Sequence, residues 1–107
     1  MMKEKIQPGD VWIVDLGIAA KVRPVLVLTP EPIDTEQVLF TFVQHTTSVQ
    51  EGNPWQVRVP KPWLHEGAFH LQNINSVSRA RFVRKLGALT VDEFDMLKSR
   101  LRERLGL

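Results

Sequence analysis

The sequence predicts a mostly β (α+β) fold, a small barrel or sandwich of short strands followed by one C-terminal helix. Two observations carry this prediction. Short apolar and β-branched segments recur up to residue 86, separated by turns rich in Pro, Gly and Asn, which is typical of small β folds. After residue 90 the apolar side chains recur every three to four positions, which is the period of a helix.

The length of 107 residues predicts a single domain, 1–107, because a chain of this size hides only about two thirds of its unfolded surface in one core. There is no cysteine, so disulfides and thiolate metal sites are excluded. No apolar run approaches the roughly 20 residues that cross a bilayer, and the N-terminus lacks an apolar signal segment. We therefore expect a cytoplasmic protein without membrane contact.

Charge is distributed unevenly along the chain. Residues 1–78 carry six basic and eight acidic side chains, a net charge of −2, whereas residues 79–107 carry eight basic and four acidic ones, a net charge of +4. This asymmetry permits a polyanionic partner, although a basic helix face is more often simply solvated.

The first three expected strands are the most apolar ones. They cover residues 11–16, after the Pro8-Gly9-Asp10 turn, then 25–28 and 38–43. The second strand would start at Pro24, since proline cannot donate to a sheet ladder but suits a strand's first residue. The polar cluster 44–48 follows the third strand.

Three shorter strands are expected at 55–59, 68–71 and 82–86, with a polar connection between the last two. The C-terminal helix is predicted from its caps: Thr90 as N-cap, Glu93 three residues later as the partner of a capping box, and Gly106 as the stop. The apolar side of this helix repeats at Phe94, Leu97, Leu101 and Leu105.

Arg23 is the first candidate functional residue. It lies in the stretch Lys21–Thr29, where a loop is predicted to lead into a buried strand. A guanidinium held there by a rigid element suits phosphate, which it grips through two parallel hydrogen bonds. The structural alternative is a rim arginine paired with a nearby Asp or Glu.

Further polar candidates follow other strands: His45, Thr46 and Thr47 after the third strand, and His70 with Gln72 near the fifth. If these sites and Arg23 met on one rim, they would supply a phosphate-binding cation, a hydroxyl donor and a histidine, which suffices for metal-free RNA cleavage. The structural alternatives are that the threonines form turns and that His70 packs in its strand. The three histidines have no metal-ligand spacing, and no nucleotide-binding or hydrolase motif occurs, so we expect no metal and no cofactor.

Five blocks of the sequence resemble, in order, the MazF/PemK (Kid) toxins of bacterial toxin–antitoxin systems. They are residues 9–16 (GDVWIVDL), 23–28 (RPVLVL), 43–47 (VQHTT), 53–59 (NPWQVRV) and 85–90 (KLGALT). The resemblance implies an SH3-like β-barrel with a C-terminal helix, usually a homodimer. It also implies a metal-independent endoribonuclease that cleaves single-stranded RNA and is blocked by an antitoxin protein.

The resemblance also assigns roles to residues. Arg23 matches the arginine of the family's Arg-Pro motif, with a role in acid–base catalysis or in stabilising the phosphorane. Thr46 matches the active-site threonine, with Thr47 beside it in substrate contact. Lys21, His45, Gln72 and Asn73 are the further candidates for substrate contact.

Two features depart from the family pattern. The connection 17–21 is short where many members carry a longer loop over the site, and Gln72 stands where relatives carry a carboxylate. We therefore hypothesise that His70 takes over proton transfer, with Arg23 stabilising charge and Thr46 orienting the phosphate.

Two interpretations compete with the ribonuclease. One is a catalytically impaired nucleic-acid-binding module on the same barrel. The other is a protein-interaction domain in which Trp55, Trp63 and Phe69 form a partner surface rather than core.

Overall fold

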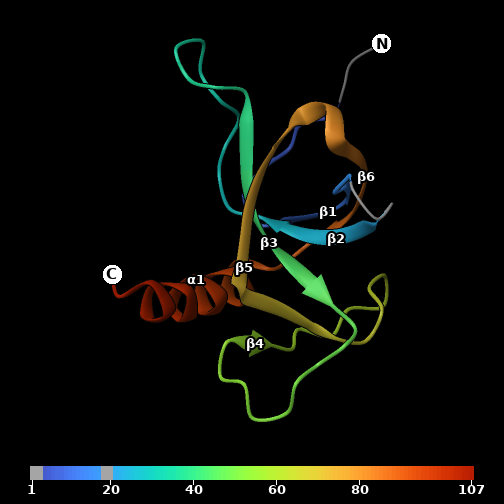
Figure 1. The fold of residues 1–107 in the computed structure, drawn as a ribbon, viewed down its shortest axis with the longest axis vertical. Coiled ribbons are helices and arrows are strands. Elements are labelled where there is room, and N and C mark those ends of the chain that lie inside the picture. The colour runs from blue at the N-terminus through green and yellow to red at the C-terminus, as the bar shows by residue number, and fades with distance from the viewer. Residues whose placement is uncertain (1–3, 18–20) are drawn as a thin grey trace.

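A single antiparallel sheet organises the chain in the computed structural model, which describes residues 4–17 and 21–107. Its strands are β1 (Asp10–Asp15), β2 (Val22–Val27), β3 (Leu39–Thr46), β4 (Gln56–Val57), β5 (Ala68–Ser78) and β6 (Phe82–Ala88). They lie in the order β4-β5-β3-β2-β1-β6 (Figure 1). The short connection expected at 17–21 lies partly outside the described residues, because 18–20 are not among them.

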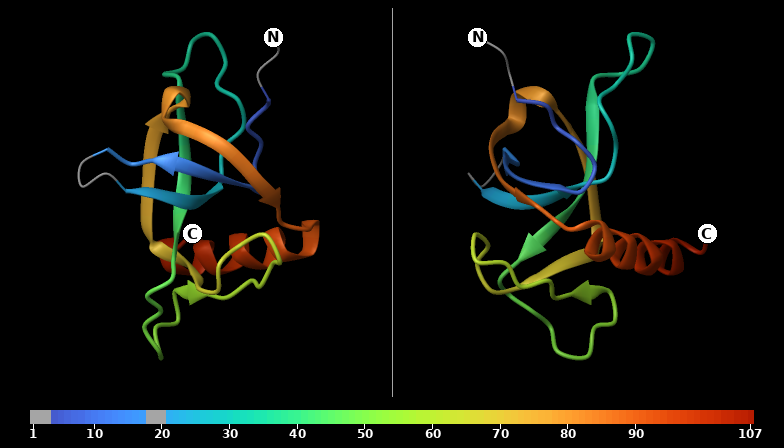
Figure 2. Two further views of the ribbon diagram at one scale, coloured as in Figure 1. Left: turned by 90° about the vertical axis from the view of Figure 1, so that its right-hand side faces the viewer. Right: turned by 180° about the vertical axis from the view of Figure 1, so that it is seen from behind.

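The predicted mostly β fold with a C-terminal helix is confirmed, but the word barrel fits only loosely. The sheet curls strongly, as both views in Figure 2 show, yet β4 and β6 end the strand order and do not pair with each other. The sheet is therefore an open one.

Helix α1 (Val91–Leu105) begins and ends as its caps predict. The Thr90 hydroxyl accepts a hydrogen bond from the Glu93 amide at 3.2 Å, and the Glu93 carboxylate accepts one from the Thr90 amide at 2.8 Å. Gly106 closes the helix in the left-handed region, with φ of 73°. The helix lies beside β5 in Figure 1.

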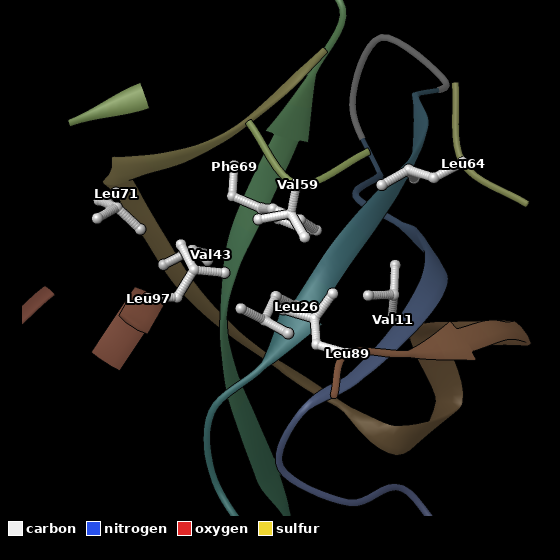
Figure 3. Packing of buried hydrophobic residues seen from close by; sticks show 9 residues of the cluster. All are labelled: Val11, Leu26, Val43, Val59, Leu64, Phe69, Leu71, Leu89 and Leu97. Carbon is white, nitrogen blue, oxygen red and sulfur yellow. The ribbon is translucent and has the colours of Figure 1, made fainter. Parts of the chain in front are cut away.

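Two apolar clusters pack on the two faces of the sheet. The cluster in Figure 3 gathers Val11, Leu26 and Val43 from the strands, Leu97 from α1, and Val59 and Leu64 from the segment before β5. The other cluster, on the inner side of the curl, includes Trp12, Val14, Val25, Phe40 and Phe42. Phe82 covers it with edge-on ring contacts to Trp12 and Phe40.

The aromatic residues proposed as a partner surface are instead part of the packing. Phe69 is fully buried, and Trp55 and Trp63 pack against the cluster of Figure 3. Trp63 lies so close over Gly87 that a methyl group there would stand 2.5 Å from its ring. The interpretation of these residues as an exposed docking surface is therefore wrong.

Two expected boundaries also differ. β5 runs through the polar stretch expected to be a loop, as far as Ser78, and a 3₁₀ turn at Arg79–Arg81 leads into β6. The expected strand 55–59 shrinks to Gln56–Val57, with Pro54 and Pro60 on either side. The long β5 carries the side chains of the candidate site.

Candidate active site

Pro24 fixes the place where the ladder between β2 and β3 ends. β2 begins at Val22, so Arg23 lies inside the strand and Pro24 is not its first residue, which corrects the expected start. The Leu16 amide donates a hydrogen bond to the Lys21 carbonyl. Hydrogen-bonded and non-hydrogen-bonded pairs alternate along an antiparallel ladder, so the pair of Ile13 and Pro24 is a non-hydrogen-bonded one. The nitrogen of Pro24 therefore points away from β1. It would have to donate toward β3, which proline cannot do.

The pairing between β2 and β3 accordingly stops at Val25 and Gln44. Beyond this pair the start of β2 and the end of β3 diverge (Figure 1). Continued by two positions, the same register would bring Arg23 opposite Thr46. The two residues therefore belong to the same face of the sheet, at an end where backbone pairing has ceased.

One row of paired residues crosses this end of the sheet. Val25 pairs with Gln44, Gln44 with His70, and His70 with Gln56. Directly paired residues project on the same side, so the inner apolar face changes here to a polar one. Thr46 pairs with Ala68, two residues before His70, and is thus a diagonal neighbour of His70 on that face.

The register thus assigns Arg23, Thr46 and His70 to the face of the sheet that carries Gln44, and their role in a common site stays a prediction. Arg23 is half-buried, and within residues 4–17 and 21–107 no carboxylate lies within 4 Å of its guanidinium. The alternative of a rim arginine neutralised by an acidic neighbour has no support among these residues.

The hydroxyl of Thr46 is oriented by the turn that follows. Its Oγ1 accepts a hydrogen bond from the Ser48 amide at 3.0 Å, which leaves the hydroxyl proton available for an acceptor such as a phosphate oxygen. Thr47, next in the chain, is exposed in the same turn.

His70 has a buried ring nitrogen, Nδ1, that finds no hydrogen-bond partner in the described part of the chain. Buried polar atoms are almost always paired, so an orphan requires an explanation, and a catalytic role is one of the recognised ones.

Asn73 lies in an irregular part of β5, where the register to β3 shifts between Val43 and Gln44. Its Oδ1 accepts hydrogen bonds from Gln44 at 3.2 Å and from Asn75 at 3.1 Å, so its own amide donors stay available. Gln72 is exposed and accepts from Asn53 at 3.2 Å. Lys21 is exposed two residues before Arg23.

His45 does not join this group. Successive strand residues point to opposite faces, so His45 projects away from Thr46 and is 3% exposed, with an edge-on contact to the Phe69 ring at 5.0 Å. Burial lowers the pKa of His45 to about 4, with a smaller contribution from nearby His65. Its ring is neutral at physiological pH.

Gln44 is the residue that sequence reasoning missed. It was grouped with the polar turn, but β3 continues through it to Thr46. The alternation Phe42, Gln44, Thr46 on one face is the signal that identifies it.

Two absences apply to residues 4–17 and 21–107 only. No group of three His, Asp or Glu side chains there is arranged to hold a metal ion. None of the helices in this part is long and apolar enough to cross a membrane.

A family model described as PemK-like, MazF-like toxin of type II toxin–antitoxin systems matches residues 7–105. The chain belongs to this family. No curated protein sequence matches it significantly.

Solved structures of PemK/MazF-type proteins share the fold. A MazE–MazF complex from Deinococcus radiodurans aligns with a TM-score of 0.80 at 20% identity, covering 98% of this chain and 99% of that one. A mycobacterial endoribonuclease in complex with its cognate antitoxin gives 0.79 at 22%, covering 95% and 96%. The Mycobacterium tuberculosis toxin MazF-mt6 gives 0.75 at 24%, covering 92% and 97%.

Proposed function

We propose that this PemK/MazF-family toxin is a metal-independent endoribonuclease that cleaves single-stranded RNA in the cytoplasm. The observation that supports the proposal is the position of Arg23, Thr46 and His70 on one face of the sheet, next to an end where Pro24 leaves β2 and β3 unpaired. The family membership and the fold shared with proteins named as endoribonucleases support it.

The proposed chemistry needs only groups of the RNA, of this face and of water. The ribose 2′-oxygen attacks the adjacent phosphorus, the bond from phosphorus to the 5′-oxygen breaks, and the products are a 2′,3′-cyclic phosphate and a 5′-hydroxyl. His70 takes the proton of the 2′-hydroxyl, and a water molecule donates one proton to the leaving 5′-oxygen. Arg23 binds the non-bridging oxygens through two donors, and the Thr46 hydroxyl orients the phosphate.

Substrate contacts are proposed for polar residues around these three. Lys21 would add positive charge beside Arg23, Thr47 a hydroxyl, and Gln72 and Asn73 amide groups for base edges. His45 belongs to the opposite face, and its role is taken up below.

An antitoxin protein is the proposed regulatory partner, since two of the similar structures are complexes with an antitoxin or with MazE. We expect an acidic antitoxin segment to compete with RNA for Arg23 and the neighbouring bases. We also propose a homodimer, as the family resemblance implies.

The test is cleavage of a single-stranded RNA panel by purified protein in EDTA, with detection of cyclic phosphate ends. We expect Arg23→Ala to lower the rate at least 100-fold and Arg104→Ala, an exposed helix residue, to leave it unchanged. His70→Ala should lower the rate throughout the range from pH 5 to 9. Equal rates for His70→Ala and wild type over this range would refute the proton-transfer role, and salt-sensitive binding without cleavage would favour the impaired binding module.

A further inference from the structure

A second feature of the molecule is a pocket of about 290 Å³ on the face of β3 opposite Arg23. Buried Val59 and Leu64 form apolar lining, and His45 contributes the one buried polar side chain. Arg58, Lys61 and His65 also line it. Ligand pockets start at about 300 Å³, so this one has room for a single small ring system rather than for a large ligand.

His45 is the buried polar side chain that lines the pocket. Among the residues described, no side-chain hydrogen bond involves its ring nitrogens. Burial lowers its pKa to about 4, which leaves one donor and one acceptor on the neutral ring. A ligand with both a donor and an acceptor on a flat edge would satisfy it.

The cations of the rim are already engaged. Arg58 pairs with Glu51 at 2.9 Å and Lys61 with Glu93 at 2.5 Å. Their positive charge is therefore largely compensated, which argues against a site for a free anion. The apolar walls and the neutral imidazole instead suit a flat heteroaromatic ring.

The pocket adjoins the proposed active site through Gly67. This glycine lines the pocket, and a methyl group on it would lie 2.1 Å from the Thr46 carbonyl oxygen and 2.8 Å from the His45 ring. His45 and Thr46 project to opposite faces, but β3 ends at Thr46. An extended RNA strand that passes the end of β3 can therefore present a phosphate to one face and a base to the other.

We propose that this pocket holds the base of a nucleotide adjacent to the cleaved phosphate, with its polar edge on His45. The proposal rests on the proposed ribonuclease function, and it assigns a residue of the opposite face to recognition of the RNA. It also gives His45 the substrate contact that the Arg23 face does not offer.

The test is a double-substitution cycle in RNA binding. Fluorescence anisotropy is measured with 2′-O-methyl oligonucleotides, which cannot be cleaved, in an unmodified series and a series with one abasic position moved along the strand. His45→Phe keeps the buried ring and its contact to Phe69 but removes the ring nitrogens. We expect one abasic position to weaken wild-type binding about tenfold. His45→Phe should weaken binding of the unmodified strand, but it should not further weaken binding of the strand that is abasic at this position.

The proposal would be overturned if, at every abasic position, the affinity loss from His45→Phe multiplied with the affinity loss from the missing base. It also fails if His45→Phe binds the unmodified strand as tightly as wild type does. His65→Trp changes an exposed residue at the rim of the pocket, so it does not disturb the core. It should narrow the pocket and weaken binding of the unmodified strand. It should not weaken binding of the strand that is abasic at the position to which wild type is sensitive. Cleavage is assayed separately. If the protein cleaves RNA but the affinity losses from His45→Phe and from each abasic position multiply, the pocket proposal is refuted and the ribonuclease proposal is not. If the two affinity losses are coupled at one position but the protein does not cleave RNA, the ribonuclease proposal is refuted and the pocket proposal is not.

Discussion

Pro24 shows how one residue can create a site inside a sheet. β2 is a central strand, where proline is ordinarily excluded because it breaks a ladder. Here its missing donor falls where His45 would accept, and pairing with β3 ends there. β2 therefore keeps its pairing with β1 as far as Val22, while its other side is unpaired at Arg23, the residue proposed to bind the phosphate.

A pH dependence of stability is expected from His45. Its pKa falls from 6.5 in the unfolded chain to about 4 in the fold, so the unfolded state binds the proton more tightly between these values. The stabilisation is complete above pH 6.5 and is lost as the pH falls toward 4. Over this window we expect a loss of about 3 kcal/mol in the free energy of unfolding.

Urea unfolding at several pH values measures this change. His45→Phe cannot take up the proton and should show a flatter profile between pH 4 and 6.5. His65→Ala is the matched control, since it should keep most of the slope: burial of His45 is the larger cause and the charge of His65 the smaller. Parallel profiles for wild type and His45→Phe would contradict the assignment.

At the scale of elements, Gly67 allows the segment before β5 to lie directly on the end of β3. A methyl group there would clash with the backbone oxygen of Thr46, which, unlike a side-chain atom, cannot move away by a change of rotamer. We expect Gly67→Ala to cost about 1–3 kcal/mol of stability and to lower RNA cleavage, because Thr46 must shift. Gly87→Ala is the comparison: it meets the Trp63 side chain and should destabilise without a matching loss of turnover per folded molecule.

Thermal unfolding and cleavage rates corrected for the folded fraction separate the two effects. If both glycine variants lose turnover equally, the contact of Gly67 with Thr46 has no special part in the site.

Glu93 joins α1 to the segment that lines the pocket. Its carboxylate caps the helix at Thr90 and pairs with Lys61, and the Lys61 contact is the main reason that the pKa of Glu93 lies below its usual value. A lowered carboxyl pKa means that this stability is present above pH 4.5 and is lost as the pH falls through the folded value. Glu93→Gln keeps the capping geometry and removes only the charge.

We expect Glu93→Gln to cost under 1 kcal/mol, since the ion pair is partly exposed, and Glu93→Ala to cost about 1–2 kcal/mol because the cap is also lost. Chemical denaturation at pH 7 measures both. Equal costs would show that the ion pair, and not the cap, carries the stability of this junction.

For the whole molecule, the sequence predicts best what is local. The caps of α1 depend on Thr90, Glu93 and Gly106 alone, and they are all found as expected. The full length of β5 was missed because its polar half reads as a loop, and its strand conformation depends on pairing with β3, which is distant in sequence. Whether the sheet closes is likewise a property of all strands together.

In the candidate site, too, local features could be predicted from the sequence, and features that depend on distant strand pairing could not. Arg23 and Thr46 could be proposed because strand ends are visible in the sequence. Separating His45 from Thr46 required the alternation along β3, and finding Gln44 at the centre required the register of three strands. The pocket at Gly67 could not be predicted, since it depends on a loop approaching a strand end.

The overall charge distribution separates two groups of basic residues in the +4 segment. Arg79, Lys85, Lys98 and Arg100 have acidic partners. Arg81 instead reaches Gly17 at the end of β1, where a methyl group would meet its guanidinium at 3.0 Å, and so lies near the start of β2 with Lys21 and Arg23. Arg104 belongs to the last turn of α1. This end of the helix lies on the opposite side of the molecule from the start of β2 in Figure 1.

Position, rather than net charge, should therefore decide the electrostatic contribution to RNA binding. Each phosphate contact with single-stranded RNA contributes about 0.7 to the slope of log affinity against log salt. We expect Arg81→Ala to reduce this slope by about 0.7 and Arg104→Ala to leave it unchanged, although both remove one positive charge. Anisotropy titrations with an uncleavable oligonucleotide between 50 and 300 mM KCl measure the slopes. Equal reductions would mean that RNA responds to the net charge of the molecule and not to the cationic end beside Arg23.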